Sequence, residues 1–267
     1  MSEMFWTERD GVSLHYKLSG EGHSLVLIHE LSGTSDSWDE VVKRLEGGYR
    51  ILRTDQRGTG LSEKVRQAFD VADMVDDIIA IIAASGLPPP YTVAGIASGA
   101  AIAVEVAARL GTAVEHLLLC SPALKANPDR RDYLVQRGAK ARQQGMRSVV
   151  DVVFERSYPT DVITDRAVYD EYRSRFLAID PVCYDLANHM LAGVDVTAAK
   201  LKLTCPVLVL AGNRDLLRPV AHVEEDIAGI ADCSLRVVDS GHIMILQAPD
   251  AVASAIRTLH QASGSNE

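Results

Sequence analysis

Residues 95–99, Gly95-Ile96-Ala97-Ser98-Gly99, have the small-x-nucleophile-x-small spacing of a nucleophile elbow. An elbow is a tight turn between a strand and a helix that exposes its central side chain above a sheet. The flanking sequence agrees, because residues 91–94 predict a short buried strand and the alanine-rich residues 99–110 predict a helix. The central residue is Ala97, which has no proton to lose and no lone pair for attack. The pattern therefore indicates an enzyme framework that forms no acyl-enzyme at residue 97.

Strands and helices alternate on both sides of this stretch. Residues 70–85 carry apolar side chains at helical spacing, and residues 251–260 form a predicted closing helix. Further predicted strands occupy residues 12–16, 24–28, 50–55, 116–120, 207–211 and 235–238. Such alternation predicts an α/β fold with a mostly parallel central sheet that is flanked by helices.

One region interrupts the alternation. Residues 124–200 contain arginine-rich helical stretches at 130–147 and 167–176, with prolines between them. We predict that this region is a helical cap inserted into one core, whose two parts are residues 1–123 and 201–267. A cap in this position covers the site that open α/β sheets form at the carboxyl ends of their strands.

Two polar residues follow predicted strands in the second part of the core. Asp215 comes after the strand at 207–211, and His242 comes after the strand at 235–238. In a catalytic triad the acid accepts a hydrogen bond from one imidazole nitrogen, so that the other nitrogen faces the nucleophile. We therefore predict a catalytic site formed by the position of Ala97, Asp215 and His242.

The chain resembles the α/β-hydrolase superfamily over nearly its whole length. Besides the elbow, the resemblance rests on residues 27–34 (LIHELSGT), on Asp36-Ser37-Trp38 and on the D-x-R-G-x-G-x-S segment at 55–62. The sequences at 137–154 and 191–195 are most similar to 3-oxoadipate enol-lactonases, which open a small carboxylated lactone. The resemblance implies a Ser-His-Asp mechanism on a small carboxylated lactone, ester or amide, and a basic cap suits such an anion.

The resemblance also implies an oxyanion hole built from the backbone N–H groups of Leu31 and Ser98. Backbone donors survive a side-chain change at residue 97. Glu30 stands where a small residue often follows the histidine, and a carboxylate there opposes an oxyanion unless it points away. The residues predicted to bind substrate are Glu30, Trp38 and Arg137.

Composition narrows the class of partner. The 27 basic and 36 acidic side chains give a net charge of −9, which argues against nucleic acid and anionic membranes, so we expect a small-molecule substrate. No apolar run reaches membrane-spanning length and the first residues do not resemble a signal peptide, so we expect a cytoplasmic protein.

We expect neither metal nor cofactor, and the oligomeric state is left open. The histidines expected to be surface or packing residues are His15, His23, His116, His189, His222 and His260.

Three hypotheses for function follow. In the first, Ala97 replaces the serine of a hydrolase, which leaves substrate binding without turnover. In the second, alanine is native and the His242–Asp215 dyad is a general base, as in cofactor-free dioxygenases and some lyases of the superfamily. In the third, the protein binds a ligand without catalysis. Activity of Ala97→Ser and His242→Ala variants distinguishes them.

Overall fold

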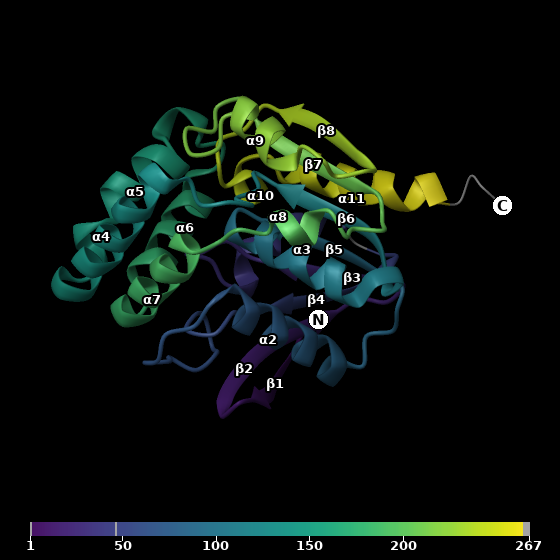
Figure 1. The fold of residues 1–267 in the computed structure, drawn as a ribbon, viewed down its shortest axis with the longest axis horizontal. Helices are drawn as coiled ribbons and strands as arrows, with labels where there is room; N and C mark the ends of the chain where they lie inside the picture. The colour runs from purple at the N-terminus through teal and green to yellow at the C-terminus, as the bar shows by residue number, and fades with distance from the viewer. Residues whose placement is uncertain (1, 46, 264–267) are drawn as a thin grey trace.

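The structure is a computed structural model that describes residues 2–45 and 47–263. Within these residues, eight strands form one sheet in the order β1-β2-β4-β3-β5-β6-β7-β8 (Figure 1). The strands are β1 (Glu3–Arg9), β2 (Val12–Ser19), β3 (His23–Ile28), β4 (Tyr49–Thr54), β5 (Tyr91–Ile96), β6 (Val114–Cys120), β7 (Val207–Gly212) and β8 (Cys233–Val238). Neighbouring strands from β4 to β8 are parallel, whereas β1 pairs with β2, and β2 with β4, in antiparallel orientation. The predicted fold class is confirmed.

Helices cover both faces of the sheet. The core helices are α1 (Asp39–Arg44), α2 (Val71–Ser85), α3 (Ser98–Leu110), α8 (Thr197–Lys200), α9 (Val220–Ile227), α10 (Met244–Gln247) and α11 (Pro249–Ser263). Short 3-10 turns are η1 (Ser35–Trp38), η2 (Gly111–Ala113), η3 (Met146–Ser148) and η4 (Thr160–Val162). Each helix and strand expected from the sequence overlaps an observed one.

The alternation of side chains along β3 divides the core into two layers. Val26 and Ile28 belong to the cluster beneath α2 and α3, whereas Leu25 and Leu27 belong to the cluster beneath α1 and α11. Successive strand residues point to opposite faces, so a strand buried on both faces is continuously apolar. Each such leucine contributes roughly 1.5–3 kcal/mol through burial.

Between β6 and β7 the chain leaves the core and forms α4 (Pro128–Gln144), α5 (Val150–Ser157), α6 (Arg166–Leu177) and α7 (Pro181–Ala192). These helices lie together beside the sheet, within the predicted cap (Figure 1). Phe154 of α5 packs against the rings of Tyr169, Tyr172 and Phe176 of α6. The cap therefore has an aromatic interior of its own.

The two chain segments that join the cap to the core are hydrogen-bonded to each other. The N–H of Ala126 donates to the carbonyl of Val194 at 2.8 Å, and the N–H of Val196 donates to the carbonyl of Leu124 at 3.0 Å. Beside them the side chains of Lys125 and Asp195 form an ion pair at 3.0 Å. We call this paired segment, residues 124–126 and 194–196, the neck.

The first strand is a feature that the sequence analysis did not predict. β1 pairs with β2 through a two-residue turn at Asp10 and Gly11, both of which have positive φ angles, 50° and 73°. This geometry is typical of the tight hairpin turn that Asp-Gly favours.

Among the described helices, none has the length and apolar character needed to cross a membrane.

Candidate active site

The elbow predicted at residues 95–99 has the expected backbone. β5 ends at Ile96, α3 begins at Ser98, and Ala97 between them has φ 52° and ψ −115°. A Cβ atom on Gly95 would lie 2.3 Å from the carbonyl oxygen of Gly99, so the strand and helix meet only because residue 95 is glycine. A positive φ angle on alanine costs of order 1–3 kcal/mol in conformational free energy, and Ala97 nevertheless has this angle.

The predicted base and acid, His242 and Asp215, are in contact with each other. The Nδ1 atom of His242 lies 2.8 Å from Oδ2 of Asp215. The other carboxylate oxygen of Asp215 accepts hydrogen bonds at 2.8 Å from the N–H groups of Leu217 and Arg218. Both side chains are buried, and His242 lines the same cavity as Ala97.

The surroundings of Asp215 keep its carboxylate ionised. Burial opposes the charged form, but the charge and hydrogen bond of His242, together with the two N–H donors, lower the pKa of Asp215 below its ordinary value. An ionised Asp215 holds the proton of His242 on Nδ1. The Nε2 atom is then the one with a lone pair for a proton at the elbow.

The two backbone donors predicted for the oxyanion hole lie at the same cavity. Ser98 is the first residue of α3, so its N–H has no partner inside that helix. Leu31 lies in the loop after β3 and also lines the cavity. That loop is held by His29, whose Nδ1 lies 2.7 Å from the carbonyl of Glu30 and whose Nε2 accepts from the N–H of Gln56 at 3.1 Å. His29 is thus a positioning residue that the sequence analysis did not single out.

Glu30 is buried at the wall of the cavity. Its Oε1 accepts hydrogen bonds from the hydroxyl groups of Ser37 and Tyr172, both at 3.0 Å. Its Oε2 is buried and has no hydrogen-bond partner among the described residues. One carboxylate oxygen is therefore anchored, and the other is packed beside Gly33.

The cavity, of about 90 Å³, lies between the carboxyl ends of the strands and the cap. Three cationic side chains line it: Arg130 and Arg137 from α4, and Arg218 from the loop after Asp215. Burial, followed by the positive charges of Arg156, Arg218 and Arg137, lowers the pKa of Arg130. A cavity that crowds guanidinium groups in this way favours an anionic ligand.

Arg137 is fixed in place by the cap itself. Its Nε donates to Oδ1 of Asn188 at 2.8 Å, and its guanidinium carbon lies 5.6 Å from the centre of the Tyr184 ring and 5.7 Å from that of Tyr133. Arg130 donates to the carbonyl oxygen of Leu217 at 3.1 Å. Both guanidinium groups are held by neutral oxygens, which leaves their charges for a ligand.

Trp38 does not lie where the sequence analysis placed it. It ends η1, is fully buried, and packs in the cluster beneath α1 and α11 rather than at the cavity. Its position one residue before α1 turns the large ring into the core, so the prediction that it binds substrate is corrected. Arg218, by contrast, was not predicted, although a basic residue soon after the acid was the available signal.

Comparisons with known proteins identify the family of the chain. Residues 22–245 match the sequence model of the family described as serine aminopeptidase, S33. A protein named as the carbamate hydrolase RutD of Variovorax paradoxus is 28% identical over 85% of this chain and 88% of its own length. 3-Oxoadipate enol-lactonase 2 of Acinetobacter baylyi is 23% identical over 93% of each chain.

Solved structures show the same fold. The enol-lactonase from Burkholderia xenovorans has a TM-score of 0.89 at 25% identity, covering 96% of this chain and 99% of its own. A thermophilic esterase from Thermogutta terrifontis has a TM-score of 0.89 at 22% identity, covering 97% of this chain and 98% of its own. Because the family match covers far more than half of the sequence, the chain belongs to the serine aminopeptidase S33 family of α/β-hydrolases.

Proposed function

We propose that this protein is a hydrolase of small carboxylated lactones, esters or amides in which Ala97 occupies the nucleophile position, so that substrate binds without being turned over. The observation that carries the proposal is the pairing of His242 with Asp215 at 2.8 Å beside an elbow that keeps its positive φ at Ala97. Strain of this kind persists at sites where it positions a reacting group. Only the reacting oxygen is missing.

The mechanism that these residues support needs a serine at residue 97. His242 Nε2 would take the proton of the serine hydroxyl while its oxygen attacks the substrate carbonyl, and the N–H groups of Leu31 and Ser98 would bind the resulting oxyanion. His242 would then give the proton to the leaving oxygen or nitrogen, and water would release the acyl group by the same steps. With alanine, none of these bonds forms.

The substrate class rests on two arginines at the cavity. Arg130 and Arg137 present positive charge to a space of about 90 Å³, which suits a small molecule with a carboxylate, whereas Arg218 is paired with Asp226 at 3.5 Å. The relatives named for an enol-lactone and for a carbamate point to the same range of acyl compounds.

The test is hydrolysis of a panel of small esters, lactones and carbamates, with and without a carboxylate, by the chain and its Ala97→Ser variant. Loss of the nucleophile from a triad costs about a millionfold in turnover, so we expect activity to rise by several orders of magnitude in the serine variant. Ala97→Gly is the matched control, since it changes the elbow without adding a nucleophile. A folded Ala97→Ser protein that binds the carboxylated esters but hydrolyses nothing would contradict the proposal.

A second candidate function is supported by Glu30. Glu30 lines the cavity and adds a second ionisable side chain beside His242. With alanine native at residue 97, His242 would remove a proton from carbon next to a carbonyl and Glu30 would exchange a proton at the same substrate. Deuterium exchange into a carboxylated ketone, followed by NMR, tests this function: the chain should catalyse it and the His242→Ala variant should not.

A further inference from the structure

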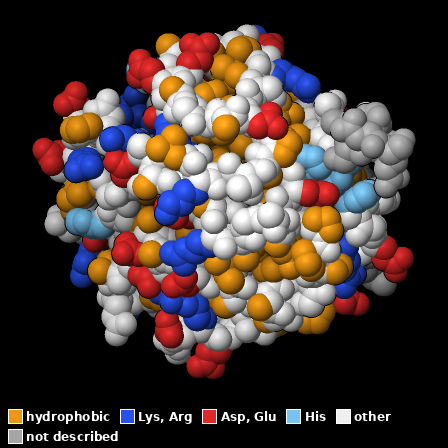
Figure 2. All heavy atoms as spheres, turned by 45° about the vertical axis from the view of Figure 1, so that its right-hand side comes forward, with side chains coloured by type: hydrophobic (Ala, Val, Ile, Leu, Met, Phe, Trp, Pro, Cys, Tyr) orange, Lys and Arg blue, Asp and Glu red, His pale blue; other side chains and the backbone are white. Residues whose placement is uncertain are grey.

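A cluster of metal-ligating side chains lies at the opposite end of the sheet from Ala97. Figure 2 shows histidine side chains beside an acidic side chain at one edge of the molecule. The cluster consists of His23 at the first residue of β3, Glu115 at the second residue of β6, and His260 near the end of α11. His23 and Glu115 stand at the amino ends of parallel strands, whereas the candidate active site stands at the carboxyl ends.

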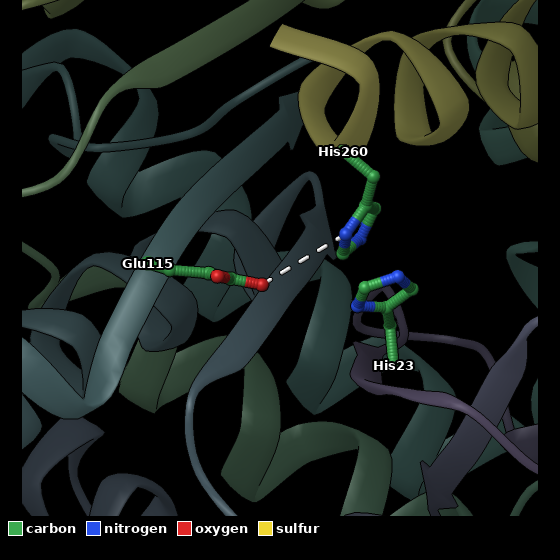
Figure 3. Close-up of side chains that lie close together, drawn as sticks. All are labelled: His23, Glu115 and His260. Atoms are coloured by element: carbon green, nitrogen blue, oxygen red, sulfur yellow. Dashed lines mark ion pairs between the residues drawn. The ribbon is translucent and has the colours of Figure 1, made fainter. Parts of the chain in front are cut away.

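The three side chains point toward one another from separate elements (Figure 3). One donor atom from each lies within 4.8 Å of the others. The Oε1 atom of Glu115 is 3.8 Å from Nδ1 of His260, and the ring centres of His23 and His260 are 4.5 Å apart. A tetrahedral ion with bonds of about 2.1 Å holds its ligands roughly 3.4 Å apart, so a small movement of the exposed His23 ring closes the geometry.

The surroundings of His260 prepare one ring nitrogen for a ligand role. Its Nε2 lies 3.0 Å from the hydroxyl of Thr92, and the ring of Tyr49 packs edge-on at 5.1 Å between centres. A hydrogen bond at one ring nitrogen is the usual way in which a protein orients a metal-binding histidine. Here it directs the Nδ1 atom toward Glu115.

A fourth side chain with a nitrogen donor lies beside the three. His116 adds a further imidazole, with its Nδ1 atom 3.7 Å from Oε1 of Glu115.

We propose that His23, Glu115 and His260 form a binding site for a divalent transition-metal ion of the Zn²⁺ type. Two imidazoles and one carboxylate are a donor set that zinc accepts, with the remaining coordination position left for water or a neighbouring side chain. No metal was expected from the sequence, because it contains no local cluster of metal-ligating residues. The ion would join β3, β6 and α11, so its role is to hold the last helix to the sheet rather than to take part in hydrolysis.

The test uses the full chain after treatment with a chelator, titrated with Zn²⁺ at pH 7.5 in a calorimeter. We expect one ion per chain with micromolar or tighter affinity and a higher melting temperature with the metal. His23→Gln is the main variant, because its exposed side chain can change without disturbing the core, and it should weaken binding at least tenfold. His260→Gln and Glu115→Gln should do the same.

The matched control is His189→Gln. His189 is an exposed histidine on α7 with a carboxylate neighbour, Asp185, at 3.6 Å, but among the described residues it belongs to no group of three metal-ligating side chains. Its variant should bind Zn²⁺ as the parent chain does. Absence of saturable Zn²⁺ binding, or equal affinity in the parent and in His23→Gln and Glu115→Gln, would overturn the proposal. Mg²⁺ should not compete, because it prefers oxygen ligands in octahedral geometry.

Discussion

The hydroxyl of Tyr172 on α6 donates a hydrogen bond to Oε1 of Glu30 in the loop after β3, at 3.0 Å. This bond joins the cap to the loop that carries Leu31. Burial, followed by the charge of Glu30, raises the pKa of Tyr172 well above its ordinary value, so the phenol remains a donor at neutral pH. The cap is thus tied to the loop after β3 through a buried carboxylate.

The first prediction concerns this bond. Tyr172→Phe removes one of the two hydroxyl donors to a buried carboxylate, and we expect the free energy of unfolding to fall by about 1–3 kcal/mol. Tyr158 offers an opposite control, because its hydroxyl is buried without a hydrogen-bond partner among the described residues. Tyr158→Phe should leave stability unchanged or raise it. Urea unfolding of both variants measures the difference, and equal losses would show that the bond to Glu30 contributes nothing.

The second prediction concerns the acid of the dyad, in the Ala97→Ser background. Asp215→Asn should lower kcat by about ten-thousandfold, because an asparagine holds His242 in the wrong tautomer. The KM for the best ester should change little. Asp239→Asn is the control, since Asp239 is an exposed partner of Arg214 at 3.0 Å. Comparable activity of the Asp215→Asn and parent serine proteins would remove Asp215 from the mechanism.

The third prediction concerns the arginines of the cap. Arg137→Gln and Arg130→Gln should each weaken binding of a carboxylated ester to the Ala97 chain about tenfold or more, since a charge-assisted hydrogen bond contributes roughly 1.5–3 kcal/mol. A neutral ester of the same shape should be unaffected. Calorimetric titration measures both, with the exposed Arg166→Gln as control. Equal losses for the charged and neutral esters would indicate damage to the cap rather than lost charge recognition.

The fourth prediction concerns acid stability. Asp55 is buried, and burial opposes its charge, but hydrogen bonds from His15, Ser35 and Leu61 lower the pKa of Asp55 below its ordinary value. A carboxyl whose pKa is lower in the folded state stabilises the protein above the unfolded pKa of about 4 and loses that effect as the pH falls further.

Asp55→Asn should therefore cost about 2 kcal/mol at pH 7 and less at pH 3, so that the stability of the variant changes less with pH than that of the parent. Urea unfolding at several pH values measures this slope. Asp170→Asn, at an exposed position of α6, should follow the parent curve. A slope for Asp55→Asn equal to that of the parent would contradict the assignment.

Local patterns were enough to predict most of the fold. The continuous apolar runs at β3, β5 and β7 are typical of strands buried on both faces, and Asp70 before α2 forms the capping box that its type and position favour. β1 was missed because its side chains are largely exposed and carry little apolar alternation. The Asp10-Gly11 pair was the signal that could have revealed it.

The candidate site could be predicted where the type of a residue and its position after a strand indicate its chemistry. Asp215 and His242 follow strands whose carboxyl ends must meet, and the structure places them in contact. Trp38 was misplaced because a motif match does not say which way a ring turns. The cluster of His23, Glu115 and His260 depends on where α11 returns across the sheet, and no local pattern carries that information.

The neck has a consequence for how this protein can be altered. Because its two segments bond to each other, at Ala126 with Val194 and at Leu124 with Val196, the cap leaves and rejoins the core at one point. Cutting the chain on the core side of that point separates a scaffold that holds Asp215 and His242 from an exchangeable cassette that holds Arg130 and Arg137. Under the proposed function, grafting another cassette onto this scaffold would change which substrate binds, while the core would keep Asp215 and His242.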